Sequence, residues 1–251
     1  MRRALTMTAS FSCATALGVG LALAADAALA SAPLVVDDLR FEPRPAQREH
    51  QEEAAERWVS DVPETSAVAP RSTWDSSPPV TSLRARSRPL SSSSFIVVHH
   101  SDFEGAPGPQ AILDYHRTEA GFSDIGYHVV VAADGRVYEA RRIDLVGAHA
   151  GISREQGRDK RNDPDEDTIG VVLDGDYEHE LPPPAQLASA AAVIRDLRAR
   201  YRIKAHQVIG HRDVKARVVE AKGHHLKGDG TVCPGDRAYD VLPALRLLSE
   251  P

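Results

Sequence analysis

The stretch Phe95-Ile96-Val97-Val98-His99-His100 places two histidines directly after an apolar, mostly β-branched run. An apolar run of this length is typical of a buried β-strand. A histidine at the end of such a strand is held rigidly and faces a cleft, as a metal ligand must, or it is a structural histidine with a local hydrogen bond. The pair alone leaves both interpretations open.

Two later segments carry further potential metal ligands. Val208-Ile209-Gly210-His211 is a second apolar run that ends in histidine, and Thr231-Val232-Cys233-Pro234-Gly235-Asp236 supplies a cysteine. Two imidazoles and one thiolate can hold a zinc ion and leave a fourth position for water, which is the arrangement of catalytic zinc. Adjacent strand residues point to opposite faces, so we expect only one of His99 and His100 to reach this ion.

Strands and helices are predicted to alternate over the rest of the chain. Ala133-Asp134-Gly135 is a hairpin signal between two predicted strands. The predicted strands are 95–98, 127–131, 136–140, 169–173 and 207–210, and the predicted helices are 109–120, 187–201 and 237–248. This order predicts an α/β fold, in which a single domain has a central mixed β-sheet flanked by helices.

Residues 1–30 have the pattern of a secretory signal peptide. Arg2 and Arg3 precede an apolar segment at 14–25, and Ala28-Leu29-Ala30 is a small-x-small cleavage signal. The apolar segment is shorter than the roughly 20 residues that span a bilayer, so we expect no stable membrane insertion after cleavage. We therefore expect export to the periplasm or the cell exterior, by the general or the twin-arginine route.

Two regions follow the predicted signal peptide. Residues 31–69 are polar, charged and interrupted by prolines, which indicates a linker or N-terminal arm, and residues 70–251 form the predicted domain. Cleavage would leave Cys233 as the only cysteine, so the core, not an internal disulfide, must stabilise the domain. Cys233 is either an unpaired or intermolecular thiol or a metal ligand, and zinc binding would protect it from oxidation.

Seven motifs occur along the chain in a characteristic order. They are I-V-V-H-H-S from Ile96, G-F-S-D-I-G-Y-H from Gly121, D-G-R-V-Y-E from Asp134, V-G-A-H-A from Val146, I-G-V-V-L-D-G from Ile169, G-H-R-D-V from Gly210 and C-P-G-D from Cys233. Together they resemble the zinc-dependent type 2 N-acetylmuramoyl-L-alanine amidases, which include phage lysozyme-type amidases and the peptidoglycan recognition proteins. The resemblance runs from about Pro70, just before Arg71-Ser72-Thr73-Trp74, to Leu248.

The resemblance implies a zinc domain with the fold of these proteins. By position, His99, His211 and Cys233 match the family's metal ligands, the first ligand being the first histidine of the adjacent pair. A zinc ion held in this way lowers the pKa of bound water to about 7 and polarises a carbonyl group. The resemblance therefore implies hydrolysis of an amide bond.

Three further residues match positions near the metal or the substrate in this family. Tyr127 matches a tyrosine whose hydroxyl lies by the metal and can donate to the oxyanion, although a buried core tyrosine is the alternative. Thr231 matches a position that holds lysine in some relatives and threonine in others, where a hydroxyl can hydrogen-bond the intermediate but carries no charge. His149 matches a substrate-binding residue of the groove, and a loop-packing histidine is its alternative.

Two segments depart from the family pattern. The connection between His211 and Cys233 is longer than the single short loop of the family, and it contains His224 and His225, which we expect in a solvated loop. The second segment, 154–167, is highly charged. Its alternating aspartates, Asp163, Asp165 and Asp167, resemble part of a calcium-binding loop. The glycine that follows in such loops is missing, so we expect a solvated, mobile loop here as well.

The implied reaction is cleavage of the bond between N-acetylmuramic acid and L-alanine of the stem peptide. Two alternatives are a non-hydrolytic peptidoglycan sensor on the same fold and a zinc peptidase that cuts within the stem. The cysteine argues against the sensor, because binding-only relatives commonly lose that ligand. We expect a monomer whose partner is peptidoglycan or a muropeptide. The net charge of −6 argues against a general nucleic-acid binder.

Overall fold

The computed structural model describes residues 67–78, 80–86, 88–150, 163–214 and 231–251. All of them lie within one compact unit, 41–251. The predicted signal peptide, most of the predicted linker, and the histidines His224 and His225 lie outside the described residues. Among the described residues, no helix has the length and apolar character needed to cross a membrane.

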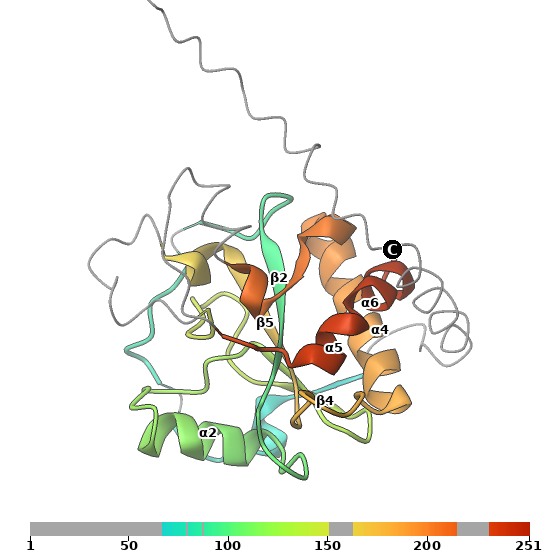
Figure 1. The fold of residues 1–251 in the computed structure, drawn as a ribbon. Helices are drawn as coiled ribbons and strands as arrows, with labels where there is room; N and C mark the ends of the chain where they lie inside the picture. The colour runs from blue at the N-terminus through green and yellow to red at the C-terminus, as the bar shows by residue number, and fades with distance from the viewer. Residues whose placement is uncertain (1–66, 79, 87, 151–162, 215–230) are drawn as a thin grey trace, which may run out of the picture. The chain divides into compact units, whose positions relative to one another are not determined.

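A six-stranded mixed sheet forms the centre of the fold, with the strand order β1-β4-β3-β5-β2-β6. Neighbouring strands are parallel except for the β3–β4 hairpin, which the sequence predicted. The strands are β1 (Val68–Ala69), β2 (Phe95–His100), β3 (Val129–Val131), β4 (Val137–Glu139), β5 (Thr168–Leu173) and β6 (Val208–Gly210). Because β5, β2 and β6 run parallel, their carboxyl ends meet at one edge of the sheet (Figure 1). Ligand sites of open α/β sheets form at this kind of edge.

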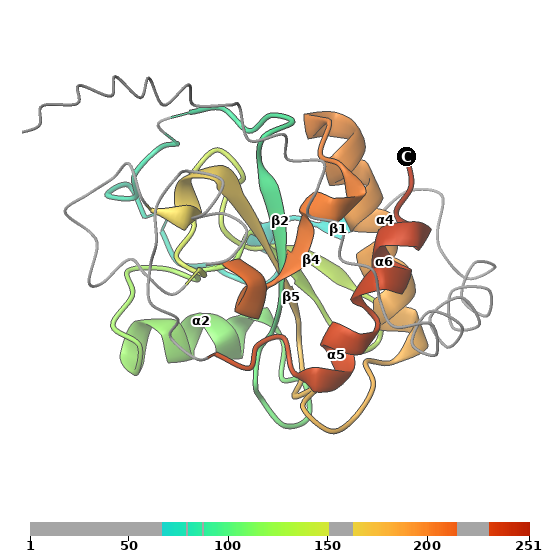
Figure 2. The ribbon, with the colours of Figure 1, turned by 45° about the horizontal axis from the view of Figure 1, so that its top comes forward.

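Helices cover both faces of the sheet, with α2 on one side and α4, α5 and α6 on the other (Figures 1 and 2). The α-helices are α2 (Pro109–Thr118), α4 (Pro184–Tyr201), α5 (Asp236–Asp240) and α6 (Leu242–Leu248); the 3-10 helices are η3 (Arg71–Thr73), η5 (Pro164–Asp167), η6 (Ala205–Gln207) and η7 (His211–Asp213). This arrangement confirms the predicted α/β fold with a central mixed sheet flanked by helices.

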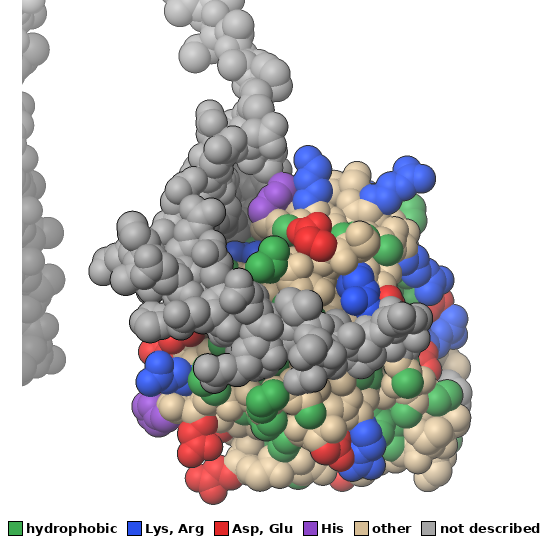
Figure 3. Space-filling view, turned by 90° about the vertical axis from the view of Figure 1, so that its right-hand side faces the viewer, with side chains coloured by type: hydrophobic (Ala, Val, Ile, Leu, Met, Phe, Trp, Pro, Cys, Tyr) green, Lys and Arg blue, Asp and Glu red, His purple; other side chains and the backbone are tan. Residues whose placement is uncertain are grey.

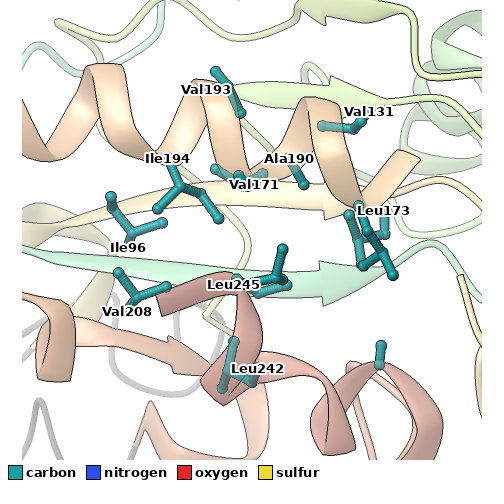
Figure 4. Packing of buried hydrophobic residues seen from close by; sticks show 14 of the residues in the cluster. Ile96, Val131, Val171, Leu173, Ala190, Val193, Ile194, Val208, Leu242 and Leu245 are labelled. Carbon is teal, nitrogen blue, oxygen red and sulfur yellow. The ribbon is translucent and has the colours of Figure 1, made fainter. Parts of the chain in front are cut away.

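The two faces of β2 belong to different parts of the core. Ile96 and Val98 pack in the cluster that includes Ile194 of α4 and Leu245 of α6 (Figure 4), whereas Val97 packs in a separate cluster. Side chains alternate between faces along a strand. His99 therefore extends from the face of Val97, and His100 from the face of Ile96 and Val98.

The predicted helix 237–248 consists of two helices, α5 and α6, in the structure. The sequence pattern of apolar residues continues across both of them, but Pro243 lies in the first turn of α6. Proline has no N–H to donate to the carbonyl one helical turn earlier, and its ring clashes with that carbonyl. The break at Val241 therefore divides the predicted helix into α5 and α6.

Acidic and basic side chains are interspersed on the face of the molecule in Figure 3. Interspersed charges of both signs are typical of a solvated protein surface.

Candidate functional site

Three potential metal ligands meet at the carboxyl edge of the sheet. His99 is the penultimate residue of β2 and His211 follows the neighbouring parallel strand β6, so their rings lie side by side with centroids 4.6 Å apart. Cys233 precedes α5, and its Sγ lies 3.5 Å from Nδ1 of His99. One potential ligand atom from each of the three residues lies within 4.8 Å of the other two. The structure thus brings together the residues that the sequence singled out.

The burial of His99 favours the neutral form of its imidazole, which a metal requires. His99 and Cys233 are buried, whereas His211 is partly exposed, so the cluster is accessible from one side. Burial, together with the neighbouring rings of His211 and His149, holds the pKa of His99 well below its ordinary value. An imidazole must be neutral to bind a metal, so His99 is ready to act as a ligand at neutral pH.

The chemistry of this donor set fits zinc. Two imidazole nitrogens and one sulfur are typical zinc donors, and three protein ligands leave a fourth position for water or substrate. The three residues come from separate segments of the chain, and each segment is fixed by a strand or a helix. The cluster is therefore held by the fold and not by a single loop.

His100 lies on the other face of β2, apart from this cluster. Its Nδ1 accepts a hydrogen bond from the backbone N–H of Tyr177 at 3.3 Å and lies 3.7 Å from a carboxylate oxygen of Asp176. His100, Asp102 and Asp176 could also surround a cation, but both carboxylates are exposed and Nδ1 already has a hydrogen-bond donor. We therefore assign no ion to this second group.

The aromatic ring of Tyr127 lies next to the ligand cluster. Its centroid is 5.0 Å from that of His99 and 5.3 Å from that of His116, a buried residue of α2. Burial raises the pKa of Tyr127 well above its ordinary value, so its hydroxyl keeps its proton at neutral pH and can act as a hydrogen-bond donor. The structure thus gives Tyr127 the protonation state that oxyanion stabilisation requires.

His116 positions the backbone before Tyr127, a role that sequence reasoning missed. Its Nδ1 accepts the N–H of Gly126 at 3.0 Å, and a Cβ on Gly126 would lie only 2.3 Å from the carbonyl oxygen of Ala148. The available signal was the helical spacing of His116 behind Ile112 on the buried side of α2. That signal predicts burial, but it does not reveal the hydrogen-bond partner across the fold.

Thr231 lies beside the cysteine of the cluster. Its hydroxyl oxygen accepts the backbone N–H of Cys233 at 3.2 Å, and the residue is partly exposed. A threonine oxygen two positions before a backbone N–H commonly stabilises a turn in this way. The contact fixes the backbone of the segment that carries Cys233.

The side chain of His149, which the family resemblance places near the substrate, lies next to the ligand cluster. Its side chain is fully buried, and its ring meets the ring of His99 nearly at right angles with centroids 5.0 Å apart. His149 Nδ1 lies 3.0 Å from Nε2 of His99. His149 therefore contacts a candidate metal ligand, and the glycines around it leave the space that its ring occupies.

The end of the charged segment 154–167 is also not the solvated loop that we expected. Residues 163–167 include the helix η5, and Asp163, Asp165 and Glu166 are buried. Arg84 forms ion pairs with Asp163, at 2.8 Å, and with Glu166. Asp165 accepts the backbone N–H groups of residues 149 and 150 at 3.0 and 2.9 Å. Buried charges require partners of this kind, and here the segment supports the site.

A model of the N-acetylmuramoyl-L-alanine amidase family, Amidase_2, matches residues 89–236, which is more than half of the chain. The chain belongs to the Amidase_2 family. The matched range contains every candidate site residue named above: His99, Tyr127, His149, His211, Thr231 and Cys233. The predicted resemblance to type 2 amidases and peptidoglycan recognition proteins is thereby confirmed.

Individual relatives agree with this assignment. The chain is 29% identical over 154 residues to peptidoglycan-recognition protein LB of Drosophila melanogaster, which covers 58% of this chain and 56% of that protein. It is 28% identical over 191 residues to human N-acetylmuramoyl-L-alanine amidase, which covers 70% of this chain and 28% of that protein. The chain thus spans about half or less of the length of these curated relatives.

A solved structure shares the fold of this Amidase_2 member. It is a mutant of Drosophila PGRP-LB in complex with tracheal cytotoxin, with a TM-score of 0.51 and 26% sequence identity. The match covers 68% of this chain and 90% of that one. The described part of the chain therefore has the fold of peptidoglycan recognition proteins.

Proposed function

We propose that this protein is an exported, zinc-dependent N-acetylmuramoyl-L-alanine amidase. Its reaction is hydrolysis of the amide bond between N-acetylmuramic acid and the L-alanine of the stem peptide, in peptidoglycan or muropeptides. The proposal rests on the ligand set His99, His211 and Cys233, with the ring of Tyr127 5.0 Å from that of His99. It is supported by the human relative named as an amidase and by the PGRP-LB complex with tracheal cytotoxin.

The residues of the cluster have distinct roles in this reaction. His99, His211 and Cys233 would hold zinc, which when bound makes water nucleophilic near neutral pH and polarises the amide carbonyl. The Tyr127 hydroxyl donates a hydrogen bond to the amide oxygen as negative charge develops on it. Thr231 holds the backbone of Cys233 through its hydroxyl oxygen and is partly exposed, and its hydroxyl can hydrogen-bond the reaction intermediate.

Mass spectrometry of digested cell-wall sacculi tests the proposal directly. We expect released stem peptides with intact L-alanine ends, one zinc per purified chain, and loss of activity after chelation with recovery on adding zinc. Shortened stems would identify a peptidase within the stem, and an unchanged wall with bound protein would identify a sensor. A metal-free protein with full activity would remove zinc from the mechanism.

Export is a separate part of the proposal and has its own measurement. The arginines, the apolar segment and the cleavage signal within residues 1–30 support it. Expressed with its leader, the mature protein should begin at Ser31 and be recovered outside the cytoplasm. N-terminal sequencing that finds the uncleaved chain inside the cell would contradict this prediction.

A further inference from the structure

The two ring nitrogens of His99 face different partners. Nδ1 lies 3.5 Å from the sulfur of Cys233, and Nε2 lies 3.0 Å from Nδ1 of His149. A histidine can bind a metal through only one nitrogen when the other carries a proton, and that N–H almost always donates to a fixed acceptor. The position of Cys233 makes Nδ1 the metal-binding atom, so the acceptor for Nε2–H is His149.

We propose that His149 is a positioning residue for metal binding, whose Nδ1 accepts the Nε2–H of His99 and so directs the Nδ1 lone pair of His99 toward the ligand cluster. This inference rests on the proposed function, because it assumes that the cluster binds zinc. It assigns His149 a buried position behind the ligand His99. Asp165 and Thr168 complete the arrangement on the far side of His149.

The protons along this line of residues can be assigned in a consistent way. The Thr168 hydroxyl donates to the carbonyl oxygen of Pro164 at 2.8 Å, so its oxygen faces Nε2 of His149, 3.4 Å away, as an acceptor. Nε2 of His149 must then carry the proton, which leaves Nδ1 of His149 unprotonated. An unprotonated Nδ1 is what the Nε2–H of His99 requires.

A buried carboxylate fixes the other side of His149. One oxygen of Asp165 lies 3.7 Å from Nε2 of His149 and accepts the backbone N–H groups of His149 and Ala150. These two hydrogen bonds prevent the carboxylate from turning away. The ring of His149 thus lies between two oriented acceptors, the Asp165 carboxylate and the Thr168 hydroxyl oxygen, and the ring of His99.

Two glycines provide the space that the His149 ring occupies. A Cβ on Gly147 would lie 2.4 Å from Cδ2 of His149, and a Cβ on Gly170 would lie 2.6 Å from its Cγ. Real Cβ atoms do not approach other atoms so closely, so either side chain would displace the ring. These glycines belong to the motifs V-G-A-H-A and I-G-V-V-L-D-G, so both motifs contribute to the space that the His149 ring occupies.

The test compares zinc affinities of full-length variants by competition with a chromophoric chelator at fixed pH. His149→Leu fills the space but accepts no hydrogen bond, and we expect its zinc affinity to fall about 10- to 100-fold, the usual effect of losing such a partner. His149→Asn offers an acceptor oxygen near the position of Nδ1 and should keep most of the affinity. In the wild type, nuclear magnetic resonance should show a protected imidazole N–H of His99 that His149→Leu lacks.

A second pair of variants keeps the test decisive if His149→Leu fails to fold. Thr168→Val removes the hydroxyl at nearly constant shape, whereas Thr168→Ser retains it, so only the valine variant should bind zinc more weakly. Folded variants with wild-type zinc affinity, either His149→Leu or Thr168→Val, would overturn the inference. A wild-type chain that binds no zinc would instead refute the proposed function itself.

Discussion

His99→Ala is expected to abolish zinc retention and amide hydrolysis, whereas His100→Ala should retain both. The two histidines are adjacent, both are buried, and they extend from opposite faces of β2. Only His99 lies within reach of His211 and Cys233. Removal of one of three protein ligands leaves two, too few for the zinc sites that proteins use in catalysis.

His100→Ala serves as the matched control for this experiment. It removes the acceptor of the Tyr177 N–H, and we expect it to lower the free energy of unfolding by about 1–3 kcal/mol, the usual cost of an unsatisfied buried group. Elemental analysis, activity and urea unfolding of both variants measure these effects. If His100→Ala loses the metal and His99→Ala keeps it, the strand is assigned one residue out of register.

Tyr127→Phe should lower the turnover number by about 100-fold, the usual scale for one oxyanion donor. The substitution keeps the ring and its contacts with His99 and His116 and deletes only the hydroxyl. Zinc content and affinity for uncleaved muropeptides should therefore change little, because the missing hydrogen bond forms mainly in the transition state.

The pH profile adds a second expectation for Tyr127. Because burial raises its pKa well above the ordinary value, the hydroxyl remains a donor through the neutral and mildly alkaline range. Its ionisation should not limit activity there, so the phenylalanine variant should keep the shape of the wild-type profile. Tyr201→Phe, at the end of α4, is the control for loss of a tyrosine hydroxyl. Full activity in zinc-loaded Tyr127→Phe would exclude Tyr127 from the reaction.

The sheet and the ligand cluster followed from local patterns in the sequence. An apolar run followed by histidine predicts both a strand and a histidine side chain at its carboxyl end. β2 and β6 each have this pattern. The alternation of faces in β2 then separates His99 from His100. Such arguments succeed where one element fixes a residue by itself.

The environment of His149 could not be predicted in this way. Its burial depends on Gly147 and Gly170, which belong to different segments and leave a space only after the sheet has formed. A sequence pattern gives no direct sign of such a space. The residue type and the motif identified His149 as a candidate site residue, but they did not predict the direction in which its ring points.

The charged segment failed to fit the prediction for a related reason. Runs of aspartate and glutamate are usually solvated, because burying a charge without a partner is costly. Here the partners are Arg84, 79 positions before Asp163, and the backbone N–H groups of residues 149 and 150, which are 16 and 15 positions before Asp165. The break before α6 was different, since Pro243 was visible in the sequence and should have ended the predicted helix.

The three candidate ligands lie in β2, directly after β6 and shortly before α5, so metal binding would be linked to folding. The unfolded chain offers these donors on distant segments, so it has little affinity for a single ion. An ion that binds only the folded form, at 100 times its dissociation constant, stabilises that form by about 2.7 kcal/mol. Zinc would thus act as a cross-link between two strand ends and the segment before α5, and this cross-link would form only once these segments have come together.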